Sequence, residues 1–164
     1  MTHKIYLTHD KGAGNPEIYK LIKRTVRTAL KAENAAVPCE VSVYVTDNAG
    51  IHALNREYRN VDKPTDVLSF PLQTLTPGSF APDASEISPE TGYLPLGDIV
   101  ISYEKAVSQA AEFGSTPERE TAYLTVHSVL HLLGYDHMDE GVQKKQMRDR
   151  EKAILPLLRL DESR

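Results

Sequence analysis

The spacing of apolar and polar residues predicts a chain that alternates strands and helices over its first two thirds and then continues as helices alone. Val41, Val43 and Val45 alternate with more polar residues, which is the period of a strand with one buried face. Short apolar runs at residues 5–7, 67–70 and 96–102 predict three more strands. This order favours a single α+β domain over residues 1–164, with a mixed sheet of about four strands packed with helices.

The predicted helices are marked by residues that suit helix termini. Proline stands at the first helical position after two of the capping side chains, and Gly114 and Gly134 suit helix ends. Five basic residues of the first helix lie largely off its apolar stripe, so we interpret them as a solvated face. The side chains that cap the four predicted helices are Asn15, Asp47, Ser102 and Thr116.

Two segments carry little apolar periodicity. Residues 76–95 contain four prolines, two glycines and three acids but no lysine or arginine, which predicts a long, mobile loop that offers little to pack. The C-terminal segment mixes basic residues between Lys144 and Arg159 with acids that include Glu140, Asp161 and Glu162. Mixed signs of this kind predict a solvated helix.

The composition is that of a globular protein and argues against a basic nucleic-acid arm. The 164 residues are 40% hydrophobic and 26% charged, and 19 Lys+Arg against 23 Asp+Glu give a net charge of −4. No apolar run reaches the roughly 18 residues of a membrane span, and Cys39 has no second cysteine to pair with. We therefore expect a cytoplasmic protein without membrane attachment, in which Cys39 is a small buried residue at a strand start.

The predicted helix from residue 117 to 133 is unusual because it is apolar nearly all round. Between Thr121 and Leu133 it has no formally charged side chain. Such a helix is typical of a protein interior. The few polar side chains within it therefore need partners, because burying an unpartnered imidazole costs on the order of 1–3 kcal/mol.

Three histidines lie on this helix and the turn after it. His127 and His131 are four residues apart and so share one helix face, while Gly134 lets the chain reverse and bring His137 back toward the pair. A histidine pair alone would often be incidental, but three histidines with a glycine at the turn favour a metal site. Three neutral nitrogens with an open fourth position are the ligand set of a catalytic zinc. Imidazole favours zinc first and leaves nickel, copper and iron open.

The same spacing occurs in metzincin peptidases, where a glutamate follows the first histidine and acts as general base. Ser128 stands at that position here, and a serine hydroxyl does not accept a proton near neutral pH. The peptidase interpretation therefore loses its base. A metal that activates water and polarises a substrate oxygen remains.

Three blocks of sequence resemble the YbeY family, the bacterial endoribonucleases and rRNA maturation factors. The first block is residues 127–137 and the third is residues 96–102. The second block consists of residues 54–55 and 58–59, followed by the run from Lys63 to Pro71. The resemblance implies a zinc-dependent, single-strand-specific endoribonuclease that acts in 16S rRNA 3′-end maturation and ribosome quality control. Its partners would be a single-stranded rRNA precursor and the ribosome or ribosomal proteins, while the oligomeric state stays open.

Carried over by position, the resemblance makes His127, His131 and His137 the ligands of one zinc ion and Arg59 the basic residue of the cleft. Asp136 either orients a ligand imidazole, acts as a base for the water, or only caps the turn. Two departures from the family stand out: Ser128 replaces the usual glycine, and residues 76–95 look like an expanded loop.

Two other functions stay open on the sequence alone. One is a metallopeptidase or another metal hydrolase, and the other is a non-catalytic ribosome-assembly factor whose metal is structural. For the nuclease, the net charge of −4 predicts few phosphate contacts and a shallow salt dependence, about two to four counterions for a single strand.

Overall fold

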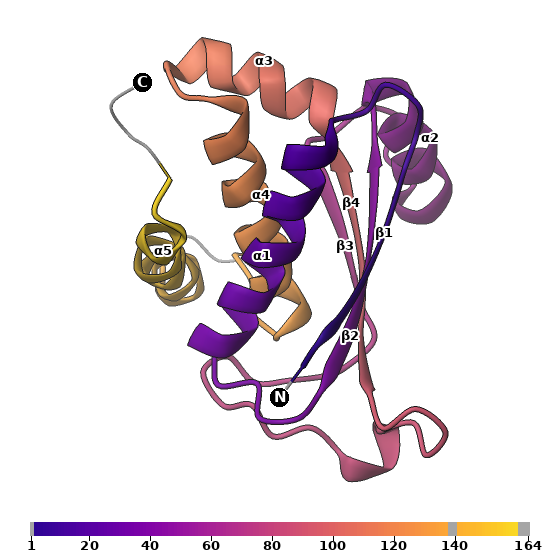
Figure 1. Ribbon diagram of the computed structural model, residues 1–164, viewed down its shortest axis with the longest axis vertical. Helices are drawn as coiled ribbons and strands as arrows, with labels where there is room; N and C mark the ends of the chain where they lie inside the picture. The colour runs from indigo at the N-terminus through magenta and orange to yellow at the C-terminus, as the bar shows by residue number, and fades with distance from the viewer. Residues whose placement is uncertain (1, 138–140, 161–164) are drawn as a thin grey trace.

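A four-stranded mixed sheet lies at the centre of the protein (Figure 1). The computed structural model describes residues 2–137 and 141–160. The strands of the sheet are β1 (Lys4–His9), β2 (Cys39–Thr46), β3 (Val67–Pro71) and β4 (Leu94–Ser102). Strands β1 and β2 pair in parallel, β2 pairs in parallel with β4, and β3 runs antiparallel to β4, so that β1 and β3 are the edges. The predicted mixed sheet is confirmed.

Four helices begin directly after the capping residues that the sequence analysis identified. Each of the four predicted capping side chains accepts a hydrogen bond from a backbone N–H in the first turn of its helix. Gly114 ends one helix in the left-handed conformation, as expected for a C-terminal glycine. The helices are α1 (Pro16–Ala32), α2 (Asn48–Arg59), α3 (Tyr103–Phe113), α4 (Pro117–Leu132) and α5 (Val142–Ile154), and short 3₁₀ turns cover Ala84–Glu86 and Leu155–Leu158.

The main core lies between one face of the sheet and helices α1 and α4 (Figure 1). Val41, Val43 and Val45 are buried there, which confirms their predicted alternation. A smaller apolar cluster covers the other face, where Ile51 of α2 packs with Leu68 and Val100. Helix α5 lies outside α4, on the side away from the sheet.

Helix α4 is the buried helix that its sequence predicted. From Thr121 to Leu132 every residue is buried except Tyr123, His127 and His131. These three are spaced four residues apart and therefore form one stripe along the helix. The two histidines of α4 thus lie on the one stripe of this part of the helix that is not buried.

Two expectations are wrong in part. Helix α5 is not solvated on all sides, because Met147, Glu151 and Ile154 are buried. Glu140, Asp161 and Glu162 of the same charged segment lie outside the described residues. The segment 76–95 does offer side chains to pack, since Phe80 and Ile87 contact the main core.

Cys39 is fully buried at the start of β2, and burial raises the pKa of its thiol to about 12. Its predicted role as a small core residue is confirmed. In the part of the chain that the structure describes, the helices are too short or too polar to span a membrane.

Candidate metal centre

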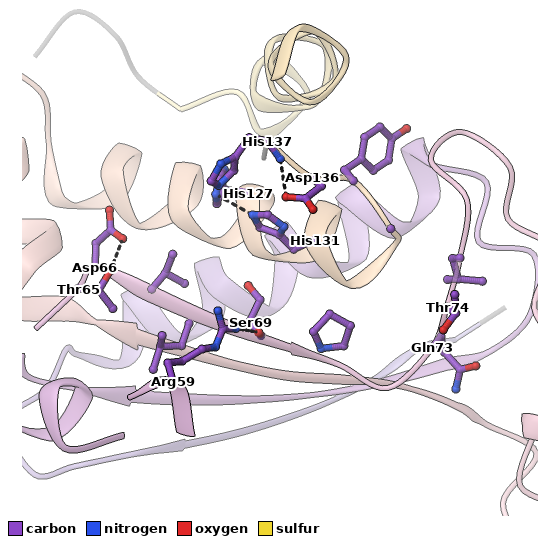
Figure 2. A pocket seen from close by; sticks show the side chains of 16 residues that line it. Arg59, Thr65, Asp66, Ser69, Gln73, Thr74, His127, His131, Asp136 and His137 are labelled. Atoms are coloured by element: carbon purple, nitrogen blue, oxygen red, sulfur yellow. Dashed lines mark hydrogen bonds between the residues drawn. The ribbon is translucent and has the colours of Figure 1, made fainter. Parts of the chain in front are cut away.

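A cleft of about 690 Å³ lies between the edge strand β3 and the C-terminal end of α4 (Figure 2). The sheet side of the cleft carries Arg59 and Ser69, and the helix side carries the three histidines of the sequence motif. Because β3 pairs with β4 on one side only, its other edge is open to this cleft.

The three histidines converge as the sequence predicted. One nitrogen from each of His127, His131 and His137 lies within 4.8 Å of the others, and the Nε2 atoms of His127 and His131 are 3.2 Å apart. The ring centroids are 4.7 to 5.4 Å apart. Two ring nitrogens this close cannot both carry protons toward one another, so the cluster is suited to share a cation.

Gly134 makes the turn that returns His137 to the helical pair. Its φ is +101°, a conformation that favours glycine. A Cβ at this position would lie 2.1 Å from the carbonyl oxygen of Leu75, so there is no room for a side chain. Turn and close packing therefore both require glycine, and the predicted reversal is confirmed.

Glu151 of α5 holds the first histidine in place. Its Oε2 lies 2.7 Å from Nδ1 of His127, and the residue is only 7% exposed. An ionised carboxylate only accepts hydrogen bonds, so Nδ1 carries the proton and the Nε2 lone pair is directed into the cluster. The sequence interpretation missed Glu151, because it lies in a segment that looked solvated.

The environment of His131 also suits metal binding. Burial, followed by the neighbouring imidazoles of His127 and His137, lowers the pKa of His131 to about 4. The imidazole is therefore neutral near pH 7, which is the form that binds a metal. A neutral His131, two further imidazoles within reach of it and a carboxylate behind one of them fit a zinc-type ion.

Arg59 reaches the same cleft from the last turn of α2. Its Nη2 donates a hydrogen bond of 2.5 Å to the carbonyl oxygen of Ser69 on the open edge of β3, and its guanidinium lies 5.3 Å from the ring centre of Phe70. These contacts hold a positive charge on the wall that faces the histidines (Figure 2). Arg59 and the three histidines are thus brought together from segments far apart in the chain.

Asp136 also lines the cleft, and its Oδ1 accepts a 2.7 Å hydrogen bond from the backbone N–H of His137. That bond is the turn-capping contact considered from the sequence. The carboxylate that contacts an imidazole of the cluster in the structure is that of Glu151, which lies 2.7 Å from Nδ1 of His127.

A buried hydrogen-bond network supports the turn and α5 from behind. The Tyr135 hydroxyl donates to Oε1 of Glu33 at 2.5 Å, and Nε of Arg150 donates to Oε2 of the same carboxylate at 2.6 Å. The Glu33 side chain is 5% exposed. The turn before His137 and the helix of Glu151 are therefore both attached to the end of α1.

The other polar residues considered from the sequence lie apart from this cluster. Ser128 is fully buried, and its hydroxyl has no hydrogen-bond partner among the described residues. His52 faces Asp62 at 2.8 Å, His3 accepts a hydrogen bond from the backbone N–H of Cys39, and His9 stacks on a tyrosine ring.

A cleft that combines three imidazoles with an arginine on an α+β scaffold defines a candidate metal-dependent hydrolase. The family model described as Endoribonuclease YbeY matches residues 6–159. The chain therefore belongs to the YbeY family of endoribonucleases.

Individual relatives agree with this assignment. The Endoribonuclease YbeY of Caldicellulosiruptor bescii is 47% identical over 93% of this chain and 95% of its own, and that of Agathobacter rectalis is 46% identical over 88% and 90%. The protein of the same name from Clostridium botulinum is 48% identical over 86% and 88%. The solution structure of TM1509 from Thermotoga maritima has a TM-score of 0.57 at 24% identity, covers 100% of this chain and 99% of its own, and shares the fold.

Proposed function

We propose that this protein is a zinc-dependent endoribonuclease that cleaves single-stranded RNA in the cleft between β3 and α4. The observation that carries the proposal is the three-histidine cluster facing Arg59 across one cleft. Membership of an endoribonuclease family supports RNA as the substrate.

His127, His131 and His137 would hold the metal through neutral nitrogens, with Glu151 fixing the orientation of His127. A zinc ion bound there would supply Lewis acidity and an activated water for phosphodiester hydrolysis. With three protein ligands, a zinc ion would keep a coordination position for water or substrate, as catalytic zinc sites do.

Arg59 would bind the phosphate that is cleaved. Its bond to Ser69 uses one of the five N–H donors of a guanidinium, so the same group can also contact phosphate oxygens. A charge fixed in advance in a partly enclosed site stabilises the negative charge that develops during hydrolysis.

Asp136 would receive the proton of the attacking water. The backbone N–H of His137 holds Oδ1, and the carboxylate lies on the cleft wall beside the histidines. A carboxylate fixed in this way is within the class of groups that act as general base.

The metallopeptidase alternative has no support from the structure. The position that would carry its glutamate is Ser128, whose side chain is fully buried among the helices and does not line the cleft. The carboxylates that do line the cleft stand at other positions of the chain, because Asp136 follows the histidine helix and Asp66 lies just before β3.

We further propose that the substrate is an rRNA precursor, that the step is maturation of the 16S rRNA 3′ end with ribosome quality control, and that the protein works in the cytoplasm with the ribosome or its proteins. The resemblance of the motif blocks to the family supports these assignments. If the metal were purely structural, rRNA maturation by this protein would lack the step that cleaves the RNA.

The test compares Arg59→Gln with Arg56→Gln, which removes an exposed charge from the same helix α2. Purified proteins are offered single-stranded RNA, the same RNA as a duplex, and casein. The proposal expects wild type and Arg56→Gln to cut only the single strand and Arg59→Gln to lose most of this activity. Cleavage of casein alone, or equal RNA cleavage by all three proteins, would contradict it.

A further inference from the structure

A second hollow lies beside the metal centre, between α4 and the end of α5. It has a volume of about 550 Å³, and residues of α4, α5 and the segment that follows line it. Among the charged residues that line it in the described part of the chain, three are basic and one is acidic, so these residues carry a positive balance. They are Arg119, Lys152 and Arg159, against Glu120. We call this site the basic hollow.

Tyr123 connects the basic hollow to the histidine cluster. It lines the hollow, is 38% exposed, and its ring centre lies 6.1 Å from that of His127. Arg119, Tyr123, His127 and His131 follow at intervals of four residues, so they form one stripe of α4. The stripe leads directly from the basic hollow to the three histidines.

Helix α5 forms the other wall and is fixed relative to the metal centre. Glu151 bonds to His127, and the next residue, Lys152, lines the basic hollow and is exposed. Arg148, one turn earlier on α5, is also exposed, while burial and the carboxylates of Glu151 and Asp66 raise the pKa of Tyr123 more than Arg148 lowers it. Positive side chains of α5 thus flank the exposed aromatic ring of α4.

We propose that the basic hollow is a second RNA subsite, which holds the single strand next to the phosphate that is cleaved. Tyr123 stacks on a base, and Lys152 and Arg159 contact phosphates. A positive groove interleaved with an exposed aromatic ring is the combination that binds single strands without reading their sequence. This inference rests on the proposed function, because it extends the path of the same RNA.

The test removes two charges from the hollow and two from elsewhere. Lys152→Gln/Arg159→Gln is compared with Lys4→Gln/Arg27→Gln, whose residues are exposed and lie toward β1, at the opposite edge of the sheet from β3. Cleavage is measured on RNAs of about three and about 12 nucleotides, because only the longer one can span two subsites. The affinity for a non-cleavable analogue of the longer RNA, about 12 nucleotides long, is measured at several salt concentrations.

The hollow variant should raise KM for the longer RNA, leave kcat and cleavage of the shorter RNA unchanged, and reduce the salt slope by about 1.4, from two contacts at about 0.7 each. The control double variant should match wild type. Tyr123→Leu should also weaken binding of the analogue, and Tyr123→Phe should not, because only the first removes the ring.

The inference is overturned if the hollow variant keeps the KM and salt slope of an active wild type. It is also overturned if that variant binds RNA normally but no longer sediments with ribosomal subunits, since the hollow would then be a protein interface. A wild type that binds the analogue in the hollow but cuts neither RNA would instead contradict the proposed function.

Discussion

Nδ1 of His127 lies 2.7 Å from Oε2 of Glu151, a buried carboxylate 24 residues further along the chain. This bond links α5 to the metal centre and fixes which nitrogen of His127 is available. The charged C-terminal helix is therefore part of the site and not only a solvated surface.

Glu151→Gln should weaken metal binding, because an amide is a poorer acceptor for the Nδ1 proton and no longer makes the imidazole more basic. Loss of such a supporting contact typically costs about 10- to 100-fold in metal affinity. Competition with a chromophoric chelator measures it. Asp149→Asn on the same helix, which loses only an exposed pair with Lys145, should keep the wild-type affinity.

Gly134→Ala should destabilise the protein and disturb the turn to His137. The matched control is Gly114→Ala, which also has a positive φ but open space around its Cβ, and should cost about 1–2 kcal/mol. Gly134→Ala adds a collision with the Leu75 carbonyl, worth a further cost of about 1–3 kcal/mol. Urea unfolding of the two variants gives the difference in the free energy of unfolding. Equal losses would show that the segment of Leu75 moves aside without a measurable loss of stability.

Tyr135→Phe should lower the free energy of unfolding by about 1–3 kcal/mol, because a buried oxygen of Glu33 loses its donor. Tyr58→Phe is the control, since that residue is 63% exposed and keeps its ring contact with Phe70. Denaturant unfolding measures both. A loss for Tyr135→Phe no larger than for the control would mean that the network does not stabilise the turn.

Asp136→Asn separates the two roles of this side chain. Asparagine keeps an oxygen that can accept from the His137 N–H, so stability and metal affinity should stay close to wild type. It cannot accept a proton near neutral pH, so kcat should fall by about 10²- to 10⁴-fold. Unchanged kcat in a folded, metal-binding variant would leave Asp136 as a turn cap alone.

The sequence predicted the parts of the fold that depend on neighbouring residues. Asn15 and Thr116 cap their helices, Val41 to Val45 alternate as a buried strand, and Gly134 reverses the chain, because each effect acts over a few residues. The convergence of the three histidines followed from the same local spacing.

The contacts between distant segments could not be predicted in this way. Glu151 stands among charged residues of a helix that looks solvated, and only the packing of α5 on α4 brings it to His127. Arg59 lies in the last turn of α2, and no local pattern shows that it reaches the edge of β3. Its place in the cleft was expected only from the resemblance to the family.

RNA cleavage by protein stripped of metal, with and without added zinc, in wild type and His131→Ala tests the proposed metal-dependent nuclease most directly. We expect chelation to abolish cleavage of single-stranded RNA by the wild type and zinc to restore it. His131→Ala should bind the metal weakly and stay inactive, because one of the three converging nitrogens is gone. Cleavage that persists after chelation and in His131→Ala would contradict the central claim that these histidines form a metal-dependent nuclease site.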